Sequence, residues 1–140
     1  MSENELSESI ELQVRFSEVD SMRVVWHGNY LKYFEEGREA FGRKYQIGYF
    51  DVENQGLMVP VVHSSIDYKK SLRYGDHLVV ETRFVNTPAA KIIFHYTIRR
   101  KDDGALIATG ETIQVFTDIH GELQLVLPEF FSRWKSKWIK

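Results

Sequence analysis

Cysteine is absent from the 140 residues of this chain. Its absence excludes disulfides, thiolate nucleophiles and cysteine-based zinc sites, and it fits a reducing compartment, so the cytoplasm is the expected location. Long hydrophobic runs are missing too, because no apolar segment approaches the ~20 residues that span a bilayer. Residues 1–9 are polar and acidic, where an export signal would be basic and then apolar. We therefore expect no membrane span and no export by that route.

An excess of charge of either sign is also lacking, since 18 basic residues face 20 acidic ones for a formal net charge of −2. Without a strong positive field the chain has no general attraction to nucleic acid or anionic lipid. Glycine-rich phosphate loops and Gly-x-Ser-x-Gly elbows are absent, which argues against nucleotide hydrolysis and serine-esterase chemistry. None of the five histidines has the spacing of a metal motif such as His-Glu-x-x-His, so we expect no metal and no other cofactor.

The residues that are present predict one folded domain. The hydrophobic share of 43% and the charged share of 27% lie in the ordinary globular range. A chain of this length buries about two thirds of its unfolded surface, which is enough for a core without disulfides or metals. We place the domain at residues 10–140 and treat residues 1–9 as a flexible N-terminus.

Two different periodicities appear in the first third of the domain. Apolar residues alternate with polar ones from Ile10 to Phe16, which predicts a strand with one buried face. Between Asn29 and Ile47 the period changes to 3.6, and a buried stripe that includes Gly37 lies opposite a charged one, which predicts one long amphipathic helix. Glycine costs up to about 1 kcal/mol in a helix relative to alanine. A close approach of the helix backbone to another element is therefore the expected use of Gly37.

Four further strands are predicted, at 57–68, 77–85, 91–99 and 105–117. Strict alternation predicts one buried face for each of the middle two, made of Leu78, Val80, Thr82 and Phe84 and of Ile92, Phe94, Tyr96 and Ile98. Asp102-Asp103-Gly104 predicts a hairpin turn, and Pro128-Glu129 begins a short C-terminal helix with an apolar side for docking. This order of elements predicts an α+β domain in which an antiparallel sheet covers one helix.

Polar, titratable and aromatic residues crowd the loop between the first strand and the long helix. The first-turn N–H groups of a helix lack internal partners and the helix dipole adds partial positive charge, so such a loop suits oxyanion stabilisation. Asp20 is the acid best placed to face that helix end, and His27 directly precedes Gly28-Asn29 at the helix start. Both also have plainer explanations, because aspartate favours turns for hydrogen bonding alone and histidine often only packs.

The loop contains Phe16, the acids Glu18 and Asp20 separated by one residue, the run Arg23-Val24-Val25-Trp26-His27, and Asn29-Tyr30. Later segments add Tyr33-Phe34-Glu35 with Arg38, Asp67-Tyr68 and Arg73-Tyr74-Gly75-Asp76. Over nearly the whole chain this pattern resembles the 4-hydroxybenzoyl-CoA thioesterase family of hotdog proteins. The resemblance implies the hotdog fold, an antiparallel sheet wrapped around one long central helix. It also implies a hydrolase that cleaves an acyl-CoA thioester into free acid and coenzyme A.

The resemblance assigns roles to individual positions. The family's catalytic aspartate falls on Asp20, which acts in the family as the nucleophile on the thioester carbonyl or as the general base for water. The backbone N–H that polarises this carbonyl falls on His27, whose side chain is expected to assist. The chain departs from the family at Arg23, where glycine is usual. Arginine should strain the loop if the position needs positive φ, or it could pair with the coenzyme or with a carboxylate on the acyl group.

A short basic cluster, Lys69, Lys70 and Arg73, follows the predicted strand at 57–68. Its charges could hold the phosphates of coenzyme A, although a solvated loop is the plainer explanation of such a run. The three residues and Arg23 are the candidate substrate-binding residues, beside Asp20 and His27 as candidate catalytic residues.

Two other functions stay open. The same chemistry could act on an acyl carrier protein, which a basic docking patch would favour. The domain could also be a non-enzymatic acyl-binding or assembly unit whose site Arg23 has disabled.

Hotdog proteins pair two sheets edge to edge with the site at the subunit boundary, and an unpaired sheet edge would invite aggregation. A homodimer or homotetramer is therefore expected.

Overall fold

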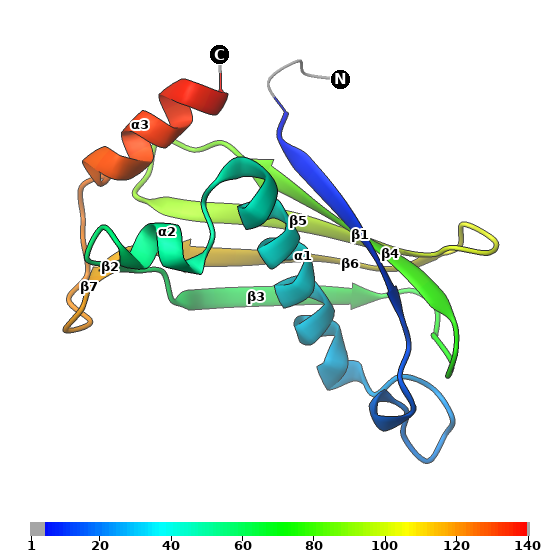
Figure 1. Ribbon diagram of the computed structural model, residues 1–140. Helices are drawn as coiled ribbons and strands as arrows, with labels where there is room; N and C mark the ends of the chain where they lie inside the picture. Colours follow the sequence, from blue (N-terminus) through cyan, green and yellow to red (C-terminus); the bar gives the residue numbers. More distant parts are fainter. Residues whose placement is uncertain (1–4, 140) are drawn as a thin grey trace.

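The structure, a computed structural model, describes residues 5–139 (Figure 1). Its strands are β1 Ser7–Gln13, β2 Leu57–Met58, β3 Val61–Tyr68, β4 His77–Val85, β5 Lys91–Arg100, β6 Leu106–Val115 and β7 Thr117–Asp118. Its α-helices are α1 Tyr30–Tyr45, α2 Tyr49–Glu53 and α3 Glu129–Trp138, and short 3-10 helices lie at Phe16–Glu18 and His27–Asn29. None of the helices in the described part of the chain has the length and apolar character needed to cross a membrane.

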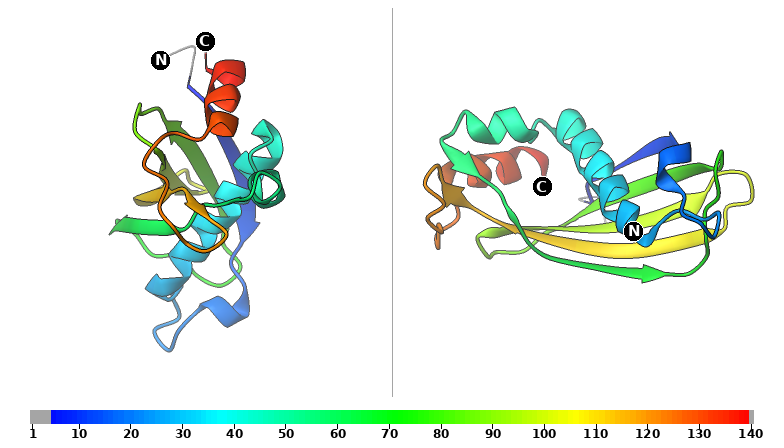
Figure 2. Two further views of the ribbon diagram at one scale, coloured as in Figure 1. Left: turned by 90° about the vertical axis from the view of Figure 1, so that its left-hand side faces the viewer. Right: turned by 90° about the horizontal axis from the view of Figure 1, so that it is seen from below.

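Five strands form one antiparallel sheet in the order β1-β4-β5-β6-β3. The helices α1, α2 and α3 all lie on one side of this curved sheet (Figure 2, right). The short strands β2 and β7 pair with each other in a separate two-stranded sheet. The predicted α+β arrangement, an antiparallel sheet around one long helix, is therefore confirmed.

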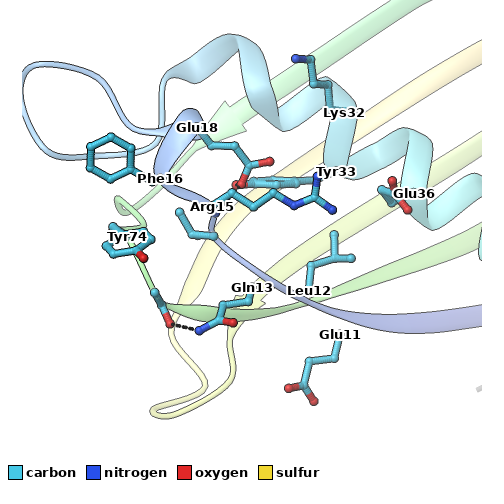
Figure 3. A pocket seen from close by; sticks show the side chains of 12 residues that line it. Glu11, Leu12, Gln13, Arg15, Phe16, Glu18, Lys32, Tyr33, Glu36 and Tyr74 are labelled. Atoms are coloured by element: carbon cyan, nitrogen blue, oxygen red, sulfur yellow. Dashed lines mark hydrogen bonds between the residues drawn. The ribbon is translucent and has the colours of Figure 1, made fainter.

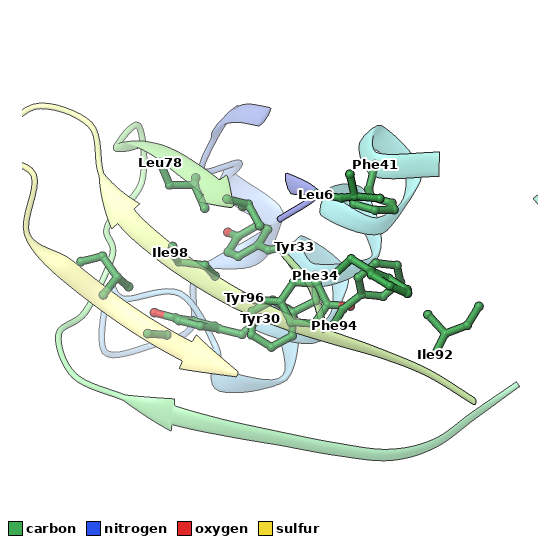
Figure 4. Packing of buried hydrophobic residues seen from close by; sticks show 14 of the residues in the cluster. Leu6, Tyr30, Tyr33, Phe34, Phe41, Leu78, Ile92, Phe94, Tyr96 and Ile98 are labelled. Atoms are coloured by element: carbon green, nitrogen blue, oxygen red, sulfur yellow. The ribbon is translucent and has the colours of Figure 1, made fainter. Parts of the chain in front are cut away.

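The core lies between α1 and the inner face of the sheet (Figure 4). Burial alternates along β4 and β5, and the buried positions are those that the sequence pattern predicted. The rings of Phe34 on α1 and Tyr96 on β5 stack with centroids 4.2 Å apart. Further along α1, the ring of Phe41 meets those of Phe84 and Phe94. The core is thus largely aromatic, and it holds α1 firmly against β4 and β5.

Gly37 brings the backbone of α1 close to the sheet, as its place in the buried stripe predicted. A Cβ atom at this position would lie 2.3 Å from the Thr82 Oγ1 atom and 3.0 Å from Val80. Any larger residue would therefore push the helix away from β4, so the small size of glycine sets the distance between helix and sheet.

The first strand begins and ends earlier than expected. β1 runs from Ser7 to Gln13 instead of from Ile10 to Phe16, so part of the segment assigned to the flexible N-terminus pairs with β4. The backbone carbonyl of Ser7 also accepts hydrogen bonds from Tyr45 Oη and Lys44 Nζ. These contacts come from distant segments, which explains why local periodicity did not reveal them. Residues 1–4 of the expected flexible N-terminus lie outside the described residues.

Two predicted strands are divided, and one short helix was not predicted. The strand expected at 57–68 separates into β2 and β3 around Pro60, because proline cannot donate to a strand ladder. The strand expected at 105–117 separates at Phe116 into β6 and β7. α2 has only five residues, too few to show a helical period in the sequence.

Candidate functional site

The loop between β1 and α1 folds into a small hairpin that carries Asp20. Val19 and Val25 form an isolated antiparallel bridge, and the Asp20 N–H donates to the Val24 carbonyl at 2.9 Å. The half-buried Asp20 side chain accepts one hydrogen bond through Oδ1, from the Met22 N–H at 2.8 Å. The other carboxylate oxygen accepts no hydrogen bond from the described residues. The hydrogen bond that gives Asp20 its plainer role, that of a turn residue, therefore uses only one of the two carboxylate oxygens.

Arg23 has a left-handed backbone conformation, with φ of 66°. Its N–H donates to the Asp20 carbonyl at 2.9 Å and closes the turn of the hairpin. The position therefore needs the positive φ that glycine adopts without strain, as the departure from the family pattern suggested. The strain lies in the backbone of the turn.

The chain enters α1 through the 3-10 turn at His27–Asn29. The backbone N–H groups of His27 and Gly28 find no acceptor among residues 5–139, so this helix start keeps unpaired donors. A Cβ atom on Gly28 would lie 2.1 Å from the Trp26 ring, which explains the glycine. Asn29 is buried and donates from Nδ2 to the Glu18 carbonyl at 2.9 Å. The helix start is thus anchored to the loop that holds Asp20.

A pocket of about 270 Å³ brings the hairpin, the start of α1 and the end of β3 together. Its lining comprises Asp20, Met22, Val24, Val25, His27, Tyr30, Tyr68, Lys69, Lys70 and Ser71. Four of the six predicted site residues therefore share one pocket, namely the predicted catalytic pair and the two lysines. Arg23 and Arg73 are not part of the lining.

Tyr68 is a pocket residue to which sequence reasoning gave no role. Its hydroxyl donates to the His27 carbonyl at 3.0 Å, and its ring packs edge-on against Tyr30 with centroids 5.1 Å apart. Burial, followed by the nearby Tyr68, raises the pKa of Tyr30, so its hydroxyl stays uncharged at neutral pH. The Asp67-Tyr68 pair of the family pattern was the available signal, but the sequence could not show that this strand ends beside the helix start.

The two lysines are placed by their backbones. The N–H groups of Lys69 and Lys70 both donate to the Ile107 carbonyl, at 2.8 and 3.1 Å. Arg73 belongs to the turn that follows, where its N–H donates to Asp76 Oδ2 at 2.9 Å. Within residues 5–139 no three His, Asp or Glu side chains gather in a way that could hold a metal ion.

A second cavity, of about 440 Å³, lies along the other half of α1, against α2, β2 and the inner face of β5 and β6. Most of its lining is apolar, including Phe41, Val52, Met58, Val59 and Phe94. At its polar side, Arg38 Nη1 donates to the Tyr96 hydroxyl at 3.1 Å. Sequence reasoning missed this cavity because its walls come from separate elements, including the unpredicted α2.

The chain matches a known protein family over most of its length. Residues 14–135 match the family model described as the Thioesterase-like superfamily. The candidate acyl-CoA thioesterase YneP of Bacillus subtilis (strain 168) is 40% identical over 88 residues, which make up 63% of this chain and 64% of YneP. The chloroplastic acyl-acyl carrier protein thioesterase ATL3 of Arabidopsis thaliana is 30% identical over 109 residues, which make up 78% of this chain and 57% of ATL3. Each match thus spans less than two thirds of the relative.

Solved structures confirm the predicted hotdog fold. The crystal structure of the DHNA-CoA thioesterase from Staphylococcus aureus superposes with a TM-score of 0.84 at 28% identity. The superposition covers 94% of this chain and 89% of that one. With the family match over 14–135, this likeness confirms the resemblance at the level of the superfamily, and the chain belongs to the Thioesterase-like superfamily.

Proposed function

We propose that the protein is a thioesterase that hydrolyses an acyl-CoA to a free acid and coenzyme A. The observation that carries this proposal is the pocket that Asp20 lines together with His27 and Tyr30 at the start of α1. Asp20 retains an oxygen that no described residue occupies, and the N–H groups of His27 and Gly28 are unpaired. Asp20 and His27 line one pocket, and Gly28 directly follows His27, so a free carboxylate oxygen and free amide donors border the same site, which suits attack on a carbonyl carbon.

Two routes fit this geometry and use one water molecule each. In the first, the Asp20 carboxylate attacks the thioester carbonyl, the coenzyme thiolate leaves, and water then hydrolyses the mixed anhydride. In the second, Asp20 accepts a proton from water as the hydroxyl adds to the carbonyl carbon, and the proton passes to the leaving thiolate. In both, the N–H groups at the start of α1 stabilise the oxyanion, and Tyr68 steadies this turn by its bond to the His27 carbonyl.

The substrate-binding roles proposed for the basic residues differ in their support. Lys69 and Lys70 line the pocket and can meet the coenzyme phosphates by charge. Arg23 and Arg73 are outside that lining, so contact with the substrate would have to occur at the rim. This position also weakens the alternative of a non-enzymatic domain, since Arg23 strains the turn without lining the pocket.

We also propose that two copies pair through β3. β3 is an edge strand, and nearly all its residues are exposed. Antiparallel pairing about a twofold axis would place the start of one β3 beside the end of the other. Met58 and Val59, in the wall of the apolar cavity, lie just before β3, whereas Tyr68 at its end lines the Asp20 pocket. The cavity of one copy would therefore continue the pocket of the other and receive the acyl group.

An acyl carrier protein remains the second candidate carrier of the acyl group. The relative ATL3, an acyl-acyl carrier protein thioesterase, favours it. Both carriers present the acyl thioester on the same phosphopantetheine arm and differ only beyond it, so the pocket serves both. Parallel assays on an acyl-CoA and on the same acyl group carried by an acyl carrier protein decide between them by the larger kcat/KM.

The first test measures thiol release from short, long and aromatic acyl-CoAs by the wild type, Asp20→Asn and Arg23→Gly. Hydrolysis by the wild type and an inactive but folded Asp20→Asn are the expected results. An inert wild type beside an active Arg23→Gly would instead establish the binding-domain alternative.

The shared site is tested by mixing two variants in one dimer. Asp20→Asn removes the carboxylate, and Met58→Trp fills the apolar cavity. The mixture is assayed on the longest acyl-CoA, on which each parent variant should lose at least about tenfold in kcat/KM. If each site joins the loop of one copy to the cavity of the other, mixed dimers regain one intact site, and random mixing restores about a quarter of the wild-type activity. Sites contained in single copies would give only the mean of the two parent activities.

A further inference from the structure

A groove of about 910 Å³ lies between β1, the N-terminal half of α1 and the loop (Figure 3). Glu18 and Tyr33 are part of its wall, and neither belongs to the lining of the Asp20 pocket. In Figure 3 the Glu18 carboxylate lies beside Tyr33, while Phe16 extends away from both. Glu18 is thus separate from the Asp20 pocket, and its link to that pocket runs through the structure of the loop.

Glu18 hydrogen-bonds to four separate points around the loop. Its carboxylate Oε1 accepts from the Arg15 N–H at 2.8 Å and from the Tyr33 hydroxyl at 3.0 Å. Its backbone carbonyl accepts from the Trp26 N–H and from Asn29 Nδ2, each at 2.9 Å. One residue thus joins the start of the loop, the end of the loop, the residue before α1 and the first turn of α1.

These bonds close the base of the hairpin that carries Asp20. The bond from the Trp26 N–H to the Glu18 carbonyl lies next to the Val19–Val25 bridge, and Asp20 follows directly. Trp26 also immediately precedes His27, whose N–H is one of the unpaired donors. The distance between the Asp20 carboxylate and those donors therefore depends on how firmly Glu18 is held.

Tyr33 anchors this hydrogen-bond network to the core. It is only 3% exposed, and its ring is part of the core beneath α1. Burial, followed by the charge of Glu18, raises the pKa of Tyr33, so the hydroxyl keeps its proton and acts as a donor. A hydrogen bond from a buried donor to a carboxylate is among the stronger ones in proteins. The loop is thus tied to the helix by a part-buried hydrogen bond whose donor belongs to the core.

We propose that Glu18, held by Tyr33, is a positioning residue that sets the Asp20 carboxylate against the N–H donors at the start of α1. The role rests on the proposed thioester hydrolysis. Glu18 touches no substrate, so its loss should reduce the rate of the chemical step more than the binding of the acyl-CoA.

The test compares two tyrosines on the same helix. Tyr33→Phe and Tyr45→Phe each remove one hydroxyl from a residue that is 3% or 8% exposed, and each hydroxyl hydrogen-bonds outside α1. Only the Tyr33 hydroxyl reaches the loop. On the acyl-CoA that the wild type hydrolyses fastest, Tyr33→Phe should lower kcat about tenfold with KM changed less than about threefold. Tyr45→Phe should leave kcat within about twofold of the wild type.

Two variants of Glu18 test whether a conservative substitution restores the activity that a truncation removes. Glu18→Ala removes the acceptor and should lower kcat by about 10- to 100-fold. Glu18→Gln keeps an oxygen that can accept from both Arg15 N–H and Tyr33, so most of the activity should return. Equal effects of Tyr33→Phe and Tyr45→Phe, or an unchanged kcat in Glu18→Ala, would overturn the proposal while leaving the thioesterase function intact.

Hydrogen exchange of the Trp26 amide measures, without any substrate, how firmly its N–H is bonded to the Glu18 carbonyl. We expect exchange about tenfold faster in Glu18→Ala and Tyr33→Phe, and unchanged exchange in Tyr45→Phe. Unchanged exchange in the first two would overturn the positioning role even if their activity fell. A wild type that hydrolyses no acyl-CoA would refute the proposed function instead, and the role of Glu18 in catalysis with it.

Discussion

The two ends of α1 border two different kinds of space. At the N-terminal end, Asp20 accepts a hydrogen bond from the Met22 N–H and Tyr68 donates one to the His27 carbonyl, and these residues line a small pocket of mixed polar and apolar character. Along the other half, apolar side chains from several elements enclose a larger cavity. Bond making requires groups fixed to within fractions of an ångström, whereas an acyl chain requires only room and apolar contact. If the proposed function holds, chemistry and selectivity are assigned to opposite halves of the same helix, α1.

The strongest test of this division is Asp20→Asn, which keeps the turn hydrogen bond but removes the charge. We expect kcat to fall about 10³-fold, with the melting temperature nearly unchanged. The matched control is Asp118→Asn, since Asp118 Oδ1 also serves a turn, accepting from the N–H groups of His120 and Glu122. Asp118→Asn should retain nearly full kcat. Equal losses in both variants would show that turn stability, not chemistry, explains the first result.

A smaller effect is expected at the cavity end, where Met58→Trp should change selectivity and not the chemical step. The added ring fills part of the cavity, so kcat/KM for the longest acyl-CoA should fall about tenfold while that for a short one stays within about twofold. Leu125→Trp, at an exposed position outside the cavity lining, is the control. A uniform loss over all chain lengths would contradict the division between the two ends.

Within residues 5–139, two residues other than glycine have a left-handed backbone, and they permit a paired stability test. Arg23 has φ of 66° in the loop, and Gln46 has φ of 60° at the C-terminal cap of α1. Glycine at either position relieves the conformational strain but adds freedom to the unfolded chain, for a net gain of about 0.5–1 kcal/mol. Thermal unfolding should show a higher melting temperature for both variants. A gain at Gln46 alone would mean that the Arg23 side chain makes compensating contacts.

The smallest expected effect is the dependence of folding stability on low pH that Asp118 causes. Hydrogen bonds from the Glu122 and then the His120 backbone lower the pKa of Asp118. A lowered pKa in the folded state adds stability that is complete above the unfolded pKa, near 4, and is lost as the pH falls through the folded value. The stability difference between wild type and Asp118→Asn, measured by urea unfolding, should therefore shrink below about pH 4. A difference that stays constant down to pH 2 would rule this out.

The sequence predicted more of the polar end than of the apolar end. Asp20 and His27 occur within one short segment, so their spacing and the family pattern could reveal them. Lys69 and Lys70 were found as a charge run, but only the fold brings them to Asp20, because both amides bond to Ile107 on a distant strand. Arg73 was part of the same run but is outside the pocket lining, because the lining ends at Ser71 and Arg73 belongs to the next turn, where its N–H donates to Asp76 Oδ2.

Glu18 shows the limit of a motif most clearly. The pattern marked it as the first of two acids, without a role. Its partner Tyr33 is far enough along the chain that only the docking of α1 brings the two side chains within hydrogen-bonding distance. The same limit applies to the apolar cavity, whose walls share no local pattern.

By itself, the sequence determined the local features, which depend on hydrophobic periodicity and on the chemistry of neighbouring residues. The alternation of β4 and β5, the long helix and the close approach at Gly37 all follow from residues near one another in the chain. The question of a positive φ at Arg23 came from the glycine usual in the family, and the structure answered it. Tertiary structure alone decided which groups meet in the pocket, where the apolar cavity lies and how the loop is held. The physical reason is that these features depend on contacts between distant segments, whose geometry is set by the packing of α1 on the sheet.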